Sequence, residues 1–490
     1  MKIHQDVKPE TRPTSLNLKV RIALIECGPI RKPMPMRSPA LNFALGAALA
    51  AFALAALSPG LLNDSDTYWH IRAGEWMIAH NAVLRADVFS YTAAGAPWHT
   101  QEWLAEVVMA LAARAGWTGI HLLFAAAAAL TAGVTAWFVR SRVDFVPALL
   151  AVVLGLACVT GSLLARPHML ALPLLAIWTA GLALAREENK APSCWLIAVM
   201  PLWANLHGSF IFGLALAGAL AVEAVIQDRK AAIGWAIFLS GAILSCLATP
   251  FGISGLLFPF HLSALQGLGH IGEWQASDFS QISPFVIALL TALFVLGRGS
   301  LKVPPFRLLI LLGLVWLALS HGRHQMLLGI VAPILLAPSL ASSWPAGSQT
   351  PKPFYAALAA LGFAALIVTR LALPVVRSDN PVSPVTALAH VPRFVRETPV
   401  LNDYAFGGYL IWNGVAPFID SRADLYGDIF LQNYAAITAP DKDALAASLA
   451  FYHVRWTIFA REAPVVKLLD SAPGWHRFYA DKLAVVHVHD

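Results

Sequence analysis

Residues 118–138 read TGIHLLFAAAAALTAGVTAWF, a stretch without any Asp, Glu, Lys or Arg. An α-helix of about 20 such residues is long enough to cross the hydrocarbon core of a bilayer. Ten further stretches are predominantly apolar and are also predicted to be helical spans, at 40–58, 145–163, 168–185, 193–205, 209–226, 231–249, 284–297, 305–320, 325–341 and 354–374. The sequence therefore predicts a mainly α protein, a polytopic helical membrane bundle of about eleven spans.

The composition also indicates a protein surrounded by lipid. Hydrophobic residues make up 58% of the 490 residues, charged residues only 13%, and the mean hydropathy is +0.64. Soluble globular proteins carry about 25% charged residues, so most of this surface is expected to face a lipid bilayer. The net charge of +6 is small, and we expect no nucleic-acid partner.

Basic residues indicate the orientation of the spans. Lys and Arg are frequent in residues 1–38 and recur in every second predicted loop, at Arg140 and Arg142, at Arg186 and Lys190, and at Arg229 and Lys230. The positive-inside rule places these loops and the N-terminal tail in the cytoplasm, with the first span retained as an anchor.

Three parts follow from this topology. Residues 1–38 form a cytoplasmic tail, residues 39–374 a transmembrane domain with a long first outer loop at 59–117, and residues 375–490 an extracytoplasmic domain. Because the last part has ordinary polarity and several turn signals, it is predicted to be a small α/β domain. Within it we expect strands at 407–412, 415–419, 454–459 and 483–488, and a helix at 441–452.

The first outer loop concentrates polar residues that suit chemistry. A helix predicted over 66–80 would place Asp66 and His70 on one face. A carboxylate and an imidazole one turn apart can bind a divalent ion such as Mg²⁺ or Mn²⁺, or act as an acid–base pair. Alternatively, Asp64 or Ser65 caps the helix and Asp66 favours its positive N-terminal end.

A second helix is predicted over 101–114, lying on the bilayer surface. Glu102 and Glu106 lie one turn apart on this helix. They either form a solvent-exposed face of the helix or serve as acidic groups of a functional site.

Further polar groups recur at the predicted outer ends of spans. They are Arg166-Pro167-His168, Asn205-Leu206-His207 and His321-Gly322-Arg323-His324. Ionisable groups at membrane depth usually line a cavity. A single ionisable side chain at a helix end can, however, extend to the membrane–water interface without having such a role. Together with the loop acids, they predict one outer pocket in which the arginines and histidines suit phosphate and the carboxylates suit a base or a metal ion.

Several motifs resemble a family of bacterial multi-spanning membrane proteins. They are DxDxxWH at 64–70, FSYT at 89–92, PWxxxEWLxE at 97–106, WANLHG at 203–208, and GGYLIW at 407–412 with DSRADLYG at 420–427. The resemblance covers nearly the whole chain after residue 40, and in organisation the family looks like the GT-C glycosyltransferase superfamily. It implies a lipid-phosphate-linked sugar donor, a catalytic acid at Asp64 or Asp66, and Arg166 or Arg323 as the group that holds the donor phosphate.

The leading hypothesis is transfer of a sugar from a polyprenyl-phosphate donor to a periplasmic glycan, lipid or protein acceptor, in the bacterial inner membrane. The candidate catalytic residues are Asp64, Asp66 and Glu102, and the candidate metal ligands are Asp66 and His70. The candidate substrate-binding residues are Arg72, His99, Arg166, His168, His207, Arg323 and His324.

Two alternatives remain open. One is a carrier or flippase of lipid-linked glycans, although such proteins usually place polar groups near the midplane of the membrane. The other is a non-catalytic assembly protein of the cell envelope, in which Asp420, Arg422 and Asp424 contact other proteins or form a structural salt bridge.

Overall fold

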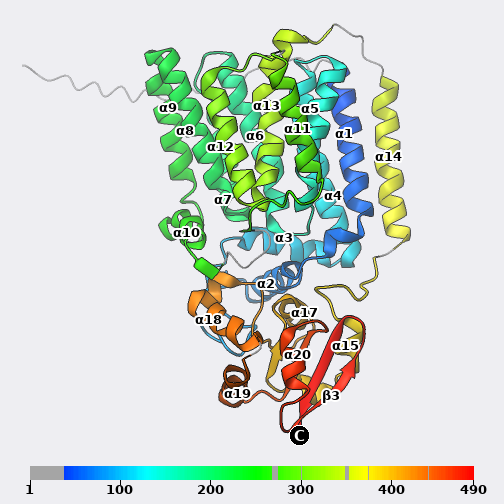
Figure 1. The fold of residues 1–490 in the computed structure, drawn as a ribbon. Coiled ribbons are helices and arrows are strands. Elements are labelled where there is room, and N and C mark those ends of the chain that lie inside the picture. Colours follow the sequence, from blue (N-terminus) through cyan, green and yellow to red (C-terminus); the bar gives the residue numbers. More distant parts are fainter. Residues whose placement is uncertain (1–37, 268–273, 300, 348–352, 374, 440) are drawn as a thin grey trace, which may run out of the picture. The chain divides into compact units, whose positions relative to one another are not determined.

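Residues 38–490 are described by the structure, a computed structural model, except 268–273, 300, 348–352, 374 and 440. The predicted N-terminal tail therefore lies, up to residue 37, outside the described residues. Helices dominate this part of the chain (Figure 1), and all of it falls within one compact unit. The prediction of a mainly α protein is confirmed.

Each of the eleven predicted apolar stretches forms a helix. Among the described residues, seven helical segments are long and apolar enough to cross a membrane, which indicates a membrane protein. They contain α1 (Ser38–Leu57), α4 (Gly116–Arg140), α5 (Phe145–Ala157), α6 (Pro167–Glu187), α8 (Phe210–Gln227), α13 (Gln325–Ser343) and α14 (Pro353–Ala372). The other stretches form the shorter helices η3 (Cys194–Ala198) with α7 (Val199–Leu206), α9 (Ala232–Ser245), α11 (Pro284–Gly297) and α12 (Pro305–Ser320).

The long helices pack around a core of large side chains. Helix α4 lies against α1 and α6, and α13 lies against α5, α6 and α12. Trp178, Trp203 and Phe124 are fully buried among them. By contrast, the outer faces carry exposed apolar residues such as Leu130, Leu293 and Leu361, as expected where lipid replaces water.

Two short helices connect the first long helix to the second. They are α2 (Asp66–His80) and α3 (Trp103–Ala113), and Figure 1 shows both at one end of the long helices, with α10 (Ile253–Ser263) nearby. The helices predicted over 66–80 and 101–114 are thus confirmed. The side chain of Asp64 holds the start of α2, because its Oδ1 accepts a 2.8 Å hydrogen bond from the backbone N–H of Asp66.

The C-terminal part contains a four-stranded sheet of order β1-β2-β4-β3. Its strands are β1 (Val400–Asn402), β2 (Trp456–Ala460), β3 (Trp475–Ala480) and β4 (Ala484–His489). Only β1 and β2 are parallel. Side chains alternate between the faces: Trp456 and Ile458 pack beside α15 (Val385–His390) and α17 (Gly407–Trp412), while Phe459 and Val485 face the other core cluster, to which α19 (Lys442–Phe451) and α20 (Pro464–Leu469) contribute.

Two predicted strands of this part are wrong. Residues 407–412 form helix α17, and residues 415–419 form no strand. The Gly407-Gly408 pair suggested a turn before a strand, but its function is close packing: a Cβ on Gly408 would lie 2.0 Å from the carbonyl oxygen of Ser65. The helix predicted at 441–452 and the strands at 454–459 and 483–488 correspond to α19, β2 and β4. Helix α18 (Ala423–Thr438) and the strands β1 and β3 had no predicted counterpart.

Candidate functional site

A cavity of about 630 Å³ lies where α2, α3 and the start of α6 meet residues 421–424. It brings together most of the predicted site residues, although they come from distant parts of the sequence. Those that line it are Asp64, Asp66, His70, His99, Glu102, Arg166, His168, His207 and Arg323.

Arg72 and His324 do not line this cavity. Arg72 lies on α2 and donates a 2.8 Å hydrogen bond to Glu75, with 39% of its side chain exposed. The ring of His324 packs instead against Phe212, at 5.1 Å between ring centroids. Because a helix turns by about 100° per residue, neighbours of a lining residue face elsewhere.

Two loop carboxylates of the cavity face one guanidinium group. Nη1 of Arg166 lies 3.5 Å from Oδ2 of Asp64, and Nη2 contacts Oδ2 of Asp66. The Oδ1 atom of Asp66 accepts a 3.3 Å hydrogen bond from the indole of Trp69. The side chains of Asp64 and Asp66 are only 11% and 8% exposed, which strengthens their attraction to Arg166.

The predicted metal pair of Asp66 and His70 does not converge on one point. Asp66 contacts Arg166, whereas both ring nitrogens of His70 face glutamates of α3. Within the described ranges, no group of three or more His, Cys, Asp or Glu side chains is arranged to hold a metal ion. By itself the predicted pair supplies one carboxylate and one imidazole, whereas a divalent cation such as Mg²⁺ prefers several converging oxygen ligands.

His70 lies between two glutamates. Its Nδ1 is 3.1 Å from Oε1 of Glu106, and its Nε2 is 3.6 Å from Oε2 of Glu102. Glu106 is fully buried, and its Oε2 has no hydrogen-bond partner. Burial raises the pKa of Glu106 well above its ordinary value and lowers the pKa of His70 well below 6.5. Both shifts favour the neutral groups, and in that state Glu106 donates to Nδ1 of His70, whose Nε2–H then points toward Glu102.

A second histidine approaches Glu102 from the loop after α7. Nε2 of His207 lies 3.3 Å from Oε1 of Glu102, and its Nδ1 accepts a 3.1 Å hydrogen bond from the backbone N–H of Ser209. Because Nδ1 is an acceptor, the neutral ring carries its proton on Nε2 and directs it at Glu102. Two imidazole N–H groups therefore face one carboxyl group.

Glu102 can act as a proton acceptor once its carboxyl group has ionised. A quarter of its side-chain surface is exposed to the cavity. Withdrawal from water raises the pKa of Glu102 to about 8, against the opposing effect of Arg166 and Arg323. A carboxylate of this kind is a stronger base than an ordinary surface glutamate.

The remaining predicted residues form other walls of the cavity. The guanidinium of Arg323 lies over the ring of Trp274, 4.3 Å from its centroid. The ring of His99 stacks on Phe251 and Phe258, at 3.9 and 4.6 Å between centroids. His168 uses Nε2 to contact the carbonyl of Ser162 at 2.8 Å.

The C-terminal part contributes a wall that sequence reasoning did not assign to the site. Ser421, Arg422, Ala423 and Asp424 all line the cavity. Asp424 accepts a 3.1 Å hydrogen bond from the indole of Trp98, and burial raises the pKa of Asp424 to about 6. The only signal in the sequence was the DSRAD run itself, whose partner loop lies more than 300 residues earlier.

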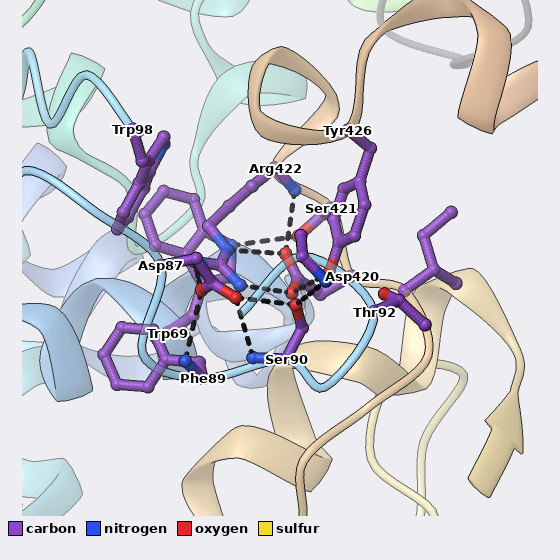
Figure 2. A network of polar contacts seen from close by, with 12 residues as sticks. Trp69, Asp87, Phe89, Ser90, Thr92, Trp98, Asp420, Ser421, Arg422 and Tyr426 are labelled. Carbon is purple, nitrogen blue, oxygen red and sulfur yellow. Dashed lines mark hydrogen bonds and ion pairs between the residues drawn. The ribbon is translucent and has the colours of Figure 1, made fainter. Parts of the chain in front are cut away.

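Arg422 holds this wall against the first loop, as Figure 2 shows. Its guanidinium donates to both oxygens of Asp420, at 2.7 and 2.6 Å, and to Oδ1 of Asp87 at 2.6 Å. It also lies 4.6 Å from the ring centroid of Trp98. All these charged groups are fully buried, so Arg422 and Asp420 have a structural role of the kind that the sequence left open.

An apolar groove of similar size, about 630 Å³, runs along α1, α4 and α5. It adjoins the polar cavity through one short segment: Thr160 and Leu163 line the groove, while Gly161, Ser162 and Leu164 line the cavity. Exposed apolar side chains border the groove, among them Leu54, Leu149 and Val153. A hydrocarbon chain in the groove would thus lie beside the polar groups of the cavity.

No protein-family model matches the chain, and no curated protein matches it.

Proposed function

We propose that this protein is a membrane-embedded glycosyltransferase, which moves a sugar from a polyprenyl-phosphate donor to an extracytoplasmic glycan, lipid or protein acceptor. One observation carries the proposal: two guanidinium groups and a carboxyl group of raised pKa share one cavity beside an apolar groove bordered by exposed apolar side chains. The guanidinium groups suit a phosphate leaving group, and the carboxyl group suits removal of a proton. The apolar groove suits a lipid donor.

In the proposed reaction, Glu102 is the general base. The hydroxyl oxygen of the acceptor attacks the anomeric carbon, and its proton passes to the carboxylate of Glu102. The bond between the anomeric carbon and the phosphate oxygen breaks, and its electron pair leaves with the polyprenyl phosphate. His70 and His207 orient Glu102 through their Nε2–H groups, and Glu106 sets the tautomer of His70.

Arg166 and Arg323 stabilise the charge that develops on the leaving phosphate. Both line the cavity, and Arg166 is held in place by Asp64 and Asp66. Preorganised positive groups of this kind often make the largest contribution to catalysis of group transfer. In this assignment the two aspartates position Arg166 and do not accept the proton.

The apolar groove accommodates the polyprenyl chain. Each CH₂ group that moves from water into such a groove contributes about 0.8 kcal/mol to binding. The groove lies along helices of membrane-spanning length, so a donor would enter from the bilayer. Together with the positive-inside rule, this favours a multi-pass protein of the bacterial inner membrane, with about eleven spans and the cavity and residues 375–490 on the periplasmic side.

The decisive experiment uses polyprenyl phosphate itself, because this product is common to every sugar donor. Native mass spectrometry in detergent measures its binding to the full-length protein, with polyprenol as the comparison. We expect binding of the phosphorylated lipid to fall at least about tenfold in Arg166→Gln and Arg323→Gln. Arg72→Gln is the matched control, because this arginine lies outside the cavity.

Transfer is then measured in vesicles with short-chain polyprenyl-phosphate glucose, mannose and arabinose as donors. Lipid binding that is equal in all variants, or equal for polyprenol and polyprenyl phosphate, would refute the proposed phosphate site. Tight lipid binding without release of sugar from any donor would instead favour the alternative function, a carrier or flippase of lipid-linked glycans.

A further inference from the structure

Asp64, just before α2, and Asp66, the first residue of α2, present two carboxylates in a way that resembles half of a cation site. Asp64 and Asp66 each use Oδ1 for hydrogen bonds within the segment and turn Oδ2 toward the same place. Two carboxylate oxygens that converge in this way are common ligands of Mg²⁺ or Mn²⁺. What lies between them, however, is the guanidinium of Arg166.

The position of Arg166 is built into the fold. Its neighbour Ala165 donates a 2.8 Å hydrogen bond from its backbone N–H to the carbonyl of Leu61, and accepts a 2.9 Å hydrogen bond from the hydroxyl of Thr67. These bonds tie the start of α6 to the residues on both sides of the two aspartates. Pro167 at the first position of α6 also favours the extended backbone of Arg166.

The contacts are those of a counter-ion. The Oδ2 atom of Asp64 contacts Nη1 of Arg166, and the Oδ2 atom of Asp66 contacts Nη2. Only 20% of the Arg166 side chain is exposed. A planar guanidinium bridges two carboxylates well, because its nitrogens lie in a fixed fork. A divalent ion would need the same oxygens at about 2.0–2.6 Å and would be repelled by the arginine.

We propose that Arg166 fills, between Asp64 and Asp66, the position that a divalent cation would otherwise take, so that no divalent ion binds there. The donor's phosphate then meets guanidinium groups in place of a metal ion. This second statement rests on the proposed function, whereas the first concerns ion binding alone.

The test is a titration of the detergent-purified, full-length protein with Mn²⁺, in which electron paramagnetic resonance measures the free ion. We expect the wild type and Arg166→Lys to bind no more Mn²⁺ than the double variant Asp64→Asn/Asp66→Asn. Arg166→Gln removes the positive charge and is expected to bind one Mn²⁺ per chain, at least about tenfold more tightly than Asp66→Asn/Arg166→Gln. Size-exclusion profiles and melting temperatures establish that each variant is folded.

Two results would overturn the inference. One is a wild-type protein that binds one Mn²⁺ per chain and loses it in the double aspartate variant. The other is Mn²⁺ binding by Arg166→Gln that is no tighter than binding by Asp66→Asn/Arg166→Gln. Neither result depends on transferase activity, so an inactive transfer assay would count against the proposed function and leave the ion-binding result intact.

Discussion

Nη1 of Arg422 donates a 2.6 Å hydrogen bond to Oδ1 of Asp87, a residue 335 positions earlier in the chain. Both side chains are completely buried. Opposite charges in such a place attract strongly, and burial raises the free energy of either charge that loses its partner. This contact joins the first loop to the C-terminal part of the cavity wall (Figure 2).

We therefore predict that Arg422→Met destabilises the protein by about 3–5 kcal/mol, because it leaves Asp87 and Asp420 buried without their cation. A thermal unfolding curve in detergent measures the change. The matched control is Arg477→Met, which breaks a partly exposed pair with Asp470 and is expected to cost less than about 1 kcal/mol. Equal losses in the two variants would contradict a special role for the buried contact.

Glu102→Gln is predicted to lower the rate of transfer by about 10²–10⁴-fold, because an amide cannot accept the proton of the acceptor hydroxyl. Glu75→Gln, a half-exposed glutamate of α2, serves as control and is expected to keep full activity. Lipid binding should be unchanged in both variants, since neither removes a positive group. A Glu102→Gln variant with wild-type turnover would exclude this residue as the base.

The rate of the wild type is predicted to rise with pH and to level off above about pH 8. Burial raises the pKa of Glu102 to about 8, so its neutral form dominates below that pH and only the carboxylate accepts a proton. The measurement is kcat/KM between pH 6 and pH 10, which reports on the free enzyme. A rate that is flat from pH 6 upward would show that the base has an ordinary carboxyl pKa.

The raised pKa of Glu106 predicts how the stability of the protein depends on pH. Burial raises its pKa in the folded protein above the value near 4.5 of an unfolded chain. Folding thus favours the protonated form, so its contribution is complete below pH 4.5 and is lost as pH rises through the folded pKa. We expect the melting temperature of the wild type to fall as the pH rises from 4.5 toward the pKa of Glu106 in the folded protein.

Glu106→Gln should flatten this decline, because a neutral amide replaces the protonated acid and still donates to His70. Melting curves at each pH compare the two proteins. The same slope in both would assign the pH dependence to another group.

Gly408→Ala is predicted to destabilise the protein and to disturb the cavity. A Cβ at this position would lie 2.0 Å from the carbonyl oxygen of Ser65, so α17 or the residues next to Asp66 must move. Gly218→Ala, in the middle of α8 with no atom within 4 Å of the new Cβ, is the control. There we expect a neutral or slightly stabilising effect, of up to about 1 kcal/mol. Melting temperatures and lipid binding distinguish the two variants.

The sequence predicted the helices far better than the C-terminal strands. The helix over residues 66–80 was predicted with the bounds it has, because Asp66 starts it and its apolar residues recur with helical spacing. Residues 407–412 were predicted as a strand and form α17, where Gly408 packs closely against Ser65 and Gly407 against Ile419 and Asp420. No local pattern reveals these contacts. Tertiary packing overrides local propensity at such positions.

Residue patterns were sufficient to predict that the chain is mainly helical, which segments are apolar enough for a membrane, and which acids and bases are candidates for chemistry. Those properties are local, since they depend on runs of neighbouring side chains. The folded chain was needed to see that Arg166 lies between Asp64 and Asp66, that His70 and His207 both face Glu102, and that Asp424 lines the same cavity. These contacts join residues far apart in the chain, and their formation depends on how the helices pack and exclude water.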